Sequence, residues 1–134
     1  MDPTAIVERY LALLADHDSD PAAIRDLLDD GMRFVEHPNL FSPGGSERDV
    51  PRIMESLAQG RRLLSGQRYE VLGHAVDGET VVTRVRWTGT LATEAGPLPA
   101  GTGLEAHSSM WFTIRGRRIA RQENYDCFTA PSPP

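Results

Sequence analysis

The second half of the chain changes from a helical to a strand-like hydrophobic pattern, and this change restricts the fold more than any other feature. Four β-rich runs follow one another, at residues 68–76, 80–91, 104–114 and 117–128. Asp77-Gly78 separates the first two runs, and an Asp-Gly pair in this position is a strong hairpin signal. A second hairpin is expected about Arg115-Gly116. The pattern predicts four long antiparallel strands.

Three helices are expected before these strands. Asp2-Pro3, Asp20-Pro21 and Asp49 mark their starts, because Asp is a favourable N-cap and proline is tolerated in the first turn. Gly31 stands where the C-cap glycine of the second helix would lie. Apolar residues with helical spacing supply the buried faces, namely Val7, Tyr10, Leu11 and Leu14, then Ile24, Leu27 and Leu28, then Ile53, Met54, Leu57, Leu63 and Leu64.

A shorter strand is expected from Met32, followed by a loop over residues 39–49 that is rich in turn-forming residues. Helices that come first and strands that follow indicate an α+β fold. Three helices packed on one face of a curved antiparallel sheet leave a hollow of the kind that binds small molecules. Residues 1–128 are expected to form one domain, and residues 129–134 a flexible tail rich in proline.

Composition argues against several classes of partner. The formal net charge is −5 and no stretch is rich in Lys and Arg, so neither nucleic acid nor an anionic membrane is an expected partner. No apolar stretch approaches the roughly 18 residues that a membrane-spanning helix needs. Cys127 is the single cysteine, so neither a disulfide framework nor a cysteine zinc cluster is expected. A cytoplasmic protein without a metal site or cofactor is the simplest interpretation.

The last strand alternates in a way that leaves its orientation open. One face carries Gln122, Asn124, Asp126 and Phe128, and the other carries Arg121, Glu123, Tyr125 and Cys127. The two preceding strands have clearer apolar faces. In the strand at residues 80–91 this face comprises Val81, Thr83, Val85 and Trp87, and in the strand at residues 104–114 it comprises Met110, Phe112 and Ile114. Their opposite faces then point outward, with Arg84, Arg86, His107, Ser109 and Trp111.

The tripeptide Glu36-His37-Pro38 ends the short strand with two ionisable groups in front of a proline. Pro38 disfavours helical geometry at His37 and therefore holds it extended. An imidazole with an unperturbed pKa of about 6.5 is a natural proton carrier near neutral pH. Alternation would allow either Glu36, with Phe34, or His37, with Val35, to enter a pocket.

These features resemble the SnoaL-like and ketosteroid-isomerase-like branch of the nuclear-transport-factor-2-like superfamily. The resemblance is carried by the order of elements, by "VVTRVRWTG" at residues 81–89 and by "IRGRRIARQENYDCF" at residues 114–128, and it extends over residues 4–128. It implies a cone of strongly bent sheet, closed by helices around a deep apolar pocket. It also implies a homodimer that pairs through the sheet.

The resemblance further implies roles for individual residues. In "ERYLALL", Tyr10 matches the phenol that stabilises the oxyanion in the isomerases, and in "VEHP", His37 matches their general base. Their second acid falls at Met110, or at Ser108 if the register slips, and the carboxylate of the cyclases falls at Asn124. Neither catalytic set is therefore complete. The same alignment directs Gln122, Asn124 and Asp126 into the pocket.

Two functions follow from these observations. The first is a cofactor-independent acid–base enzyme of isomerase, cyclase or hydratase type that acts on a small apolar molecule. His37 would move the proton, Tyr10 would stabilise the oxyanion, and Asp126 or Asn124 would orient substrate or water. The expected substrate contacts are Gln122, Phe34, Phe41, Trp87, Met110 and Phe112. The second is a non-catalytic ligand-binding or dimeric interaction protein. The enzyme gains support if His37 and Tyr10 converge on one cavity, and it loses support if Phe34, Phe41, Trp87 and Met110 fill that cavity.

Overall fold

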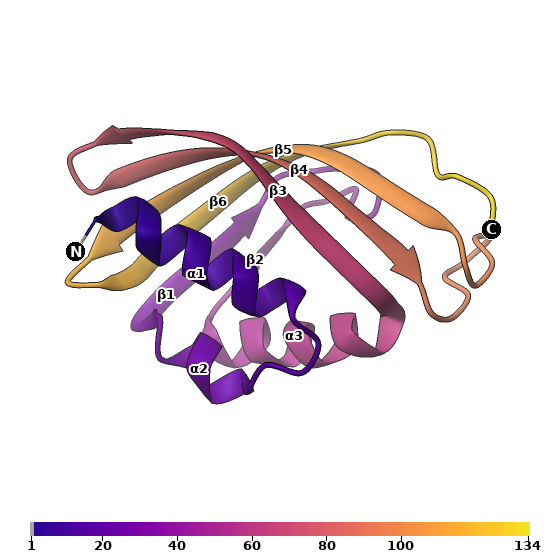
Figure 1. Cartoon of the computed structure of the whole chain (residues 1–134), viewed down its shortest axis with the longest axis horizontal. Helices are drawn as coiled ribbons and strands as arrows, with labels where there is room; N and C mark the ends of the chain where they lie inside the picture. The colour runs from indigo at the N-terminus through magenta and orange to yellow at the C-terminus, as the bar shows by residue number, and fades with distance from the viewer. Residues whose placement is uncertain (1) are drawn as a thin grey trace.

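Three helices cover the concave face of one curved six-stranded sheet in this computed structural model, which describes residues 2–134 (Figure 1). The helices are α1 (Pro3–Ala15), α2 (Pro21–Arg25) and α3 (Val50–Leu63). The strands are β1 (Leu28–Glu36), β2 (Ser46–Arg48), β3 (Leu64–Asp77), β4 (Thr80–Leu91), β5 (Gly103–Arg115) and β6 (Arg118–Phe128). The predicted α+β architecture, with its two hairpins, is confirmed.

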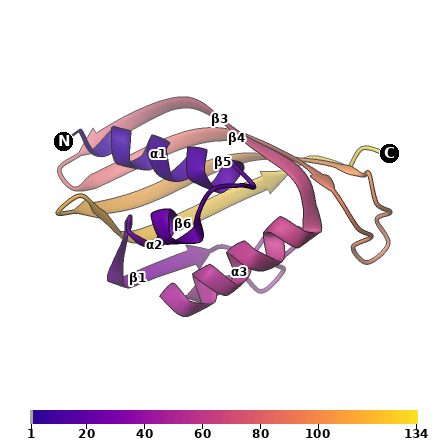
Figure 2. The same ribbon diagram turned by 60° about the horizontal axis from the view of Figure 1, so that its bottom comes forward.

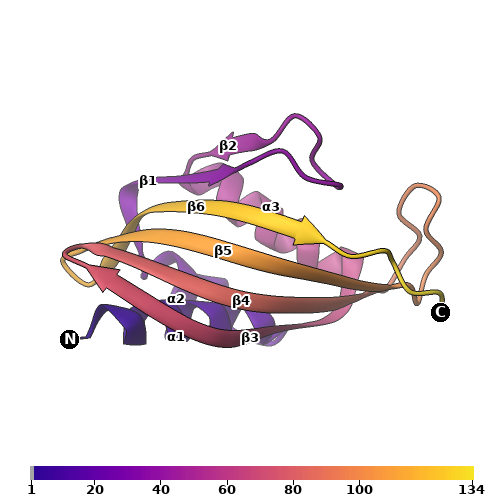
Figure 3. The same cartoon turned by 90° about the horizontal axis from the view of Figure 1, so that it is seen from above.

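The sheet runs in the order β2-β1-β6-β5-β4-β3 (Figure 3). The four long strands pair antiparallel, as the hairpin signals predict. However, β1 joins β6 in parallel, so the sheet is mixed and not wholly antiparallel. In the register of the sheet, Thr83 of β4 lies beside Met110 of β5, and Met110 lies beside Asn124 of β6. These three residues therefore share the face of the sheet that is turned toward the helices.

The predicted helix starts are confirmed in detail. The carboxylates of Asp2, Asp20 and Asp49 each accept a hydrogen bond from a backbone N–H in the first turn, at 2.9, 2.9 and 3.2 Å. A proline occupies the first turn of every helix. α1 packs against β3, and α3 lies against β1 and β3, so the two longer helices flank the concave face (Figure 2).

The segment between α2 and α3 differs from the prediction. α2 ends at Arg25 and β1 begins at Leu28, so Gly31 lies inside a strand and is not a helix C-cap. Leu28 pairs with Ile119 of β6, and both side chains are fully buried, which favours the strand over another helical turn. Residues 46–48, expected in a loop, form the short edge strand β2 against β1.

The core lies between the helices and the sheet. It contains the apolar stripe of α1 and the inward faces of β4, β5 and β6, including Val85, Phe112 and Ile119. The final segment makes one β-bridge, in which Ser132 and Gly103 exchange two hydrogen bonds of 2.9 Å. Over residues 2–134, no helix has both the length and the apolar character needed to cross a membrane.

Candidate functional site

A cavity of about 210 Å³ lies between α1 and the concave face of the sheet. Its helix side is formed by Tyr10, Leu11 and Leu14. Its floor comes from the strands, and β6 contributes a row of polar side chains, Gln122, Asn124 and Asp126. The cavity is therefore apolar on one side and carries hydrogen-bonding and acidic groups on the other, which is the usual composition of a small-molecule site.

The predicted orientation of β6 is confirmed by this lining. Gln122 and Asn124 are buried, and Gln122 Nε2 donates a hydrogen bond of 3.0 Å to Asn124 Oδ1. Glu123 and Tyr125 lie on the opposite face, where the Tyr125 side chain is exposed. The polar row on β6 thus belongs to the cavity and not to the outer surface.

Asp126 is a carboxyl group in a poorly solvated position. Its burial raises the pKa of the carboxyl, and the negative charge of Glu36 raises it further. Hydrogen bonds from Ser108 and Asn124 act in the opposite direction and lower the pKa of Asp126 in part. Ser108 Oγ donates to Asp126 Oδ1 at 2.6 Å. A carboxyl group with a raised pKa in a cavity is a candidate for proton transfer.

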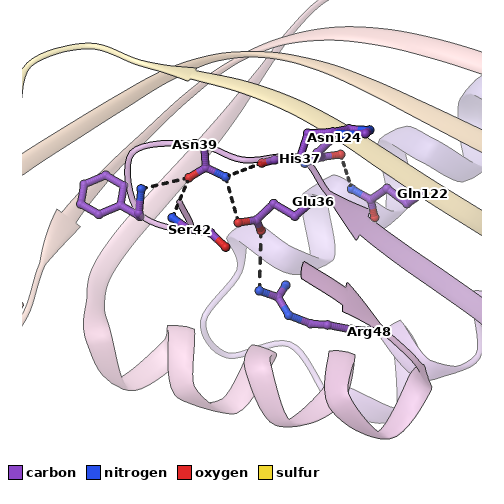
Figure 4. Close-up of polar contacts among 8 residues, drawn as sticks. Glu36, His37, Asn39, Ser42, Arg48, Gln122 and Asn124 are labelled. Atoms are coloured by element: carbon purple, nitrogen blue, oxygen red, sulfur yellow. Dashed lines mark hydrogen bonds and ion pairs between the residues drawn. The ribbon is translucent and has the colours of Figure 1, made fainter. Parts of the chain in front are cut away.

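Glu36 is the second carboxylate of the cavity. It stands beside Asn124 in the β1–β6 register, and therefore on the same face of the sheet as Asp126. Asn39 Nδ2 donates to Glu36 Oε1 at 3.0 Å, and Arg48 Nη2 lies 3.6 Å from Glu36 Oε2 (Figure 4). The carboxylate is therefore positioned by an amide and a guanidinium from two different elements.

The loop after β1 is folded back on Glu36 by Asn39. The Asn39 side chain accepts hydrogen bonds from the backbone N–H groups of Phe41 and Ser42, at 3.0 and 3.2 Å, while it donates to Glu36 (Figure 4). Gly45 completes the return with φ of +69°, and a Cβ atom there would lie 2.6 Å from the Glu36 carbonyl oxygen. Glycine is thus required for the close approach of the loop to Glu36.

His37 does not enter the cavity, contrary to the expectation from the resemblance. Its Nε2 lies 2.7 Å from Glu123 Oε2, and its ring stacks on Tyr125 with 4.3 Å between centroids. Both partners belong to the outward face of β6. The imidazole and the Tyr10 side chain therefore do not converge on one cavity, and the proton carrier expected from the sequence is outside it.

The parallel pairing of β1 with β6 explains this outcome. It places Phe34 opposite Gln122 and Glu36 opposite Asn124, and these inward residues of β6 determine which β1 residues line the cavity. His37 is the next residue after Glu36, so its side chain points to the other face. Of the two alternatives that alternation left open, the structure places Glu36 in the cavity.

Two tyrosines face the two carboxylates. Tyr10 comes from α1 and packs edge-on against Phe112, with 6.3 Å between ring centroids, whereas Tyr69 comes from β3. Burial raises the pKa of both phenols. The negative charge of Asp126, and that of Tyr10 where it ionises at high pH, raise the pKa of Tyr69 further. Both phenols therefore keep their protons near neutral pH and can donate hydrogen bonds to a ligand oxygen.

The remaining expected contacts divide into two groups. Phe34, Trp87 and Met110 line the cavity. Phe112 instead lies in the core behind Tyr10, and Phe41 is 45% exposed and packs outside the cavity against Phe128. Sequence reasoning did not select several other lining residues, among them Tyr69 and Phe128, although Phe128 shares the alternating face of Asp126.

The polar groups of the site are carboxylates, phenols and amides. In the part of the chain that the structure describes, residues 2–134, no group of three or more His, Cys, Asp or Glu side chains is arranged to hold a metal ion. The arrangement brings a carboxyl group of raised pKa and neutral phenols around one space. These groups can remove a proton from a ligand and stabilise the negative charge that develops on it.

Comparison with known proteins agrees with this architecture. A family model described as the SnoaL-like domain matches residues 7–122. The chain belongs to the SnoaL-like domain family. No curated protein matches the sequence of this SnoaL-like chain at a significant level.

Solved structures share the fold of this SnoaL-like chain. IdmH from Streptomyces antibioticus, which carries a provisional assignment as a polyketide cyclase, superposes with a TM-score of 0.78 at 18% identity, over 94% of this chain and 92% of IdmH. A SnoaL-like polyketide cyclase from Agrobacterium tumefaciens gives 0.69 at 15% identity, over 94% and 91%. A protein of ketosteroid isomerase-like fold from Catenulispora acidiphila, in complex with trimethylamine, gives 0.70 at 16% identity, over 90% and 83%. At these identities the likeness establishes the fold alone.

Proposed function

We propose that this SnoaL-like protein is an acid–base enzyme that transfers a proton on a small, largely apolar carbonyl compound, a step shared by isomerisation and aldol-type ring closure. The observation that carries the proposal is the position of Asp126, a carboxyl group of raised pKa in the same cavity as two neutral phenols. The provisional polyketide-cyclase assignment of IdmH is compatible with such chemistry.

In the proposed reaction, the Asp126 carboxylate removes a proton from the carbon beside the carbonyl group. The electrons of the broken C–H bond form the enolate, and Tyr10 or Tyr69 donates a hydrogen bond to its oxygen. The protonated Asp126 then returns the proton to carbon, so the protein is regenerated without an added acceptor. Ser108 keeps the carboxyl group oriented while it cycles between its two forms.

Glu36 has a tuning role in this scheme. Its negative charge raises the proton affinity of Asp126, which makes Asp126 a stronger base. Asn39 and Arg48 hold Glu36 in place from the loop after β1 and from β2. The two carboxyl groups of the cavity are therefore assigned different tasks, proton transfer for Asp126 and electrostatic support for Glu36.

Hydrogen–deuterium exchange tests this proposal without knowledge of the natural product. The protein is incubated in D₂O with β-tetralone, an enolisable apolar ketone, and deuterium uptake is followed by mass spectrometry against a heat-denatured sample. Uptake faster than in the denatured control is expected. Binding of β-tetralone in a thermal-shift assay with no accelerated uptake would instead favour the ligand-binding alternative.

Substitution of His37 distinguishes the cavity carboxylates from the outward imidazole. His37→Ala should leave both the exchange rate and its pH profile unchanged, because the imidazole contacts Glu123 and Tyr125 outside the cavity. Glu36→Gln, one residue earlier, should shift the acidic limb of the pH–rate profile to lower pH, because loss of the Glu36 charge lowers the pKa of Asp126. A shifted limb in His37→Ala with none in Glu36→Gln would reverse the two assignments.

A homodimer that pairs through the outer face of the sheet is part of the proposal. That face exposes Trp111, Leu72 and Tyr125, with exposed fractions of 44 to 45%. Exposed apolar patches and Trp are common at protein interfaces. Light scattering at micromolar concentration should give the mass of a dimer, and Trp111→Glu should give the monomer. Leu40→Glu, at a more exposed apolar side chain in the loop after β1, serves as the control and should remain dimeric.

A further inference from the structure

A second hollow of about 180 Å³ lies beside the cavity, on the side of α3. The two spaces share Tyr10, Leu14, Phe34 and Tyr69 as a common wall. The second hollow is otherwise lined mainly by apolar side chains from the helices and β3, including Ile24, Ile53, Leu57 and Leu64. The two spaces are therefore adjacent, and an elongated ligand that occupied both would lie between the helices and the sheet.

Arg48 is the only charged residue among those that line this second hollow. Its guanidinium lies over the Phe34 ring, 5.5 Å from the centroid, and its side chain is 27% exposed. The contact with Glu36 is 3.6 Å long, which is beyond good hydrogen-bond length. Within residues 2–134, the structure gives the Arg48 guanidinium an ion pair with Glu36 but no hydrogen bond, so its N–H groups can still donate to water or to a ligand.

The other long polar side chain of the second hollow is already engaged. Gln67 Oε1 accepts a hydrogen bond of 2.9 Å from Trp87 Nε1, and Gln67 Nε2 donates to the Leu14 carbonyl oxygen at 3.2 Å. Gln67 therefore serves the wall itself. Arg48 remains as the group that can define which ligands the second hollow accepts.

We propose that the second hollow is a subsite for the carboxylate end of an amphipathic ligand, with Arg48 as its receptor. A guanidinium presents parallel N–H groups that match the two oxygens of a carboxylate. The Phe34 ring and the apolar walls would contact the hydrocarbon part between the two ends. The other end of the ligand would carry the reactive carbonyl group near Asp126, and only this part of the inference rests on the proposed function. The substrate class is then an apolar keto acid.

A purely structural role for Arg48 makes a different prediction. If Arg48 only holds Glu36, its loss would weaken every ligand to a similar degree, whatever the charge of that ligand. If Arg48 binds a carboxylate, its loss would weaken acids and leave matched neutral esters unaffected. The ratio of the two affinities therefore separates the roles.

The experiment measures the binding of naphthylacetic acid and of its methyl ester to the full chain, with quenching of tryptophan fluorescence or calorimetry as the readout. Neither assay needs turnover, so its result is independent of the exchange test. At neutral pH the acid is ionised. We expect the acid to bind about ten- to a hundredfold more tightly than the ester, because hydrogen bonds to charged groups have this strength.

Arg48→Gln should bring the acid-to-ester affinity ratio close to one, with the ester affinity unchanged. Arg52→Gln is the matched control, because Arg52 is an exposed arginine that lines a surface groove together with Arg48 but does not line the second hollow. Its affinity ratio should equal that of the wild type. Glu36→Gln should strengthen binding of the acid alone, because it removes a carboxylate that competes for Arg48.

Three results would overturn the proposal. They are equal losses of acid and ester binding in Arg48→Gln, a wild type that does not prefer the acid, and failure of both probes to bind. Arg48→Lys addresses a folding defect in the glutamine variant, because it retains the charge but not the fork of donors. Arg48→Lys should give an acid-to-ester affinity ratio between those of the wild type and Arg48→Gln. A ratio as high as that of the wild type and Arg52→Gln would show that the charge alone suffices, and would exclude recognition by the paired N–H donors of the guanidinium.

Discussion

Asp126→Asn should lower the rate of deuterium uptake into β-tetralone by about a hundred- to ten-thousandfold, the range typical of a lost general base. Asparagine has nearly the same shape as aspartate and can still accept the Ser108 hydrogen bond, but it cannot take up a proton. The loss should appear mainly in the rate at saturating ketone, because the cavity keeps its shape. Asp18→Asn, at an exposed carboxylate in the turn after α1, is the control and should retain the wild-type rate.

The same substitution should stabilise the fold near neutral pH. Because burial raises the pKa of Asp126 above its value of 3.8 in the unfolded chain, the folded state binds more protons between the two pKa values. The free energy of unfolding therefore falls as the pH rises through that window. Asp126→Asn removes this loss, and a gain of about 1 kcal/mol at neutral pH is in the range found when a functional group is replaced.

Urea unfolding at neutral pH and at a pH below 3.8 measures this effect. The advantage of Asp126→Asn over the wild type should shrink at the lower pH, where the folded and unfolded wild type are both protonated at this site. Asp18→Asn should show no such change. If Asp126→Asn were less stable than the wild type at neutral pH, the ionised carboxylate would stabilise the fold. That result would contradict the raised pKa of Asp126.

Local signals in the sequence were sufficient for much of the fold. The cap-and-proline pairs gave the helix starts, because these interactions involve residues adjacent in the chain. Asp77-Gly78 gave the first long hairpin for the same reason. The orientation of β6 followed from alternation once the resemblance indicated which face looks inward. The caps and the hairpin depend on short-range chemistry, whereas the inward row of Gln122, Asn124 and Asp126 needed the resemblance in addition to alternation.

The position of Tyr69 could not be obtained in this way. A regular hairpin closed by Asp77 and Thr80 would place Glu70 opposite Trp87. A bulge between Val71 and Gly73 shifts the register by one residue and places Tyr69 there instead. A one-residue shift exchanges the two faces of a strand, so the bulge determines that a phenol and not a carboxylate faces Trp87.

Glu36 and His37 show a second limit of sequence reasoning. Which of them lines the cavity depends on the parallel pairing of β1 with β6, two strands that are separated by most of the chain. No nearby residue encodes that register. The resemblance favoured His37, whereas the parallel register places Glu36, together with Phe34, in the cavity.

Tyr10→Phe should lower the exchange rate by about ten- to a thousandfold, as expected for the loss of one oxyanion donor. The phenylalanine ring can keep the edge-on contact with Phe112, so the core and the affinity for the neutral ketone should change little. The loss is therefore expected in the rate constant and not in the half-saturating concentration. Tyr125→Phe, at an outward tyrosine of β6, is the matched control and should be unaffected.

The double variant with Tyr69→Phe determines whether the two phenols act on one oxygen. If both donate to the same enolate, the combined loss should differ from the product of the single losses, because each variant still benefits from the remaining donor. If only Tyr10 donates, Tyr69→Phe should have little effect alone or in combination. A wild-type exchange rate in Tyr10→Phe together with a large loss in Tyr69→Phe would transfer the oxyanion role from α1 to β3, where the bulge brought Tyr69 into the cavity.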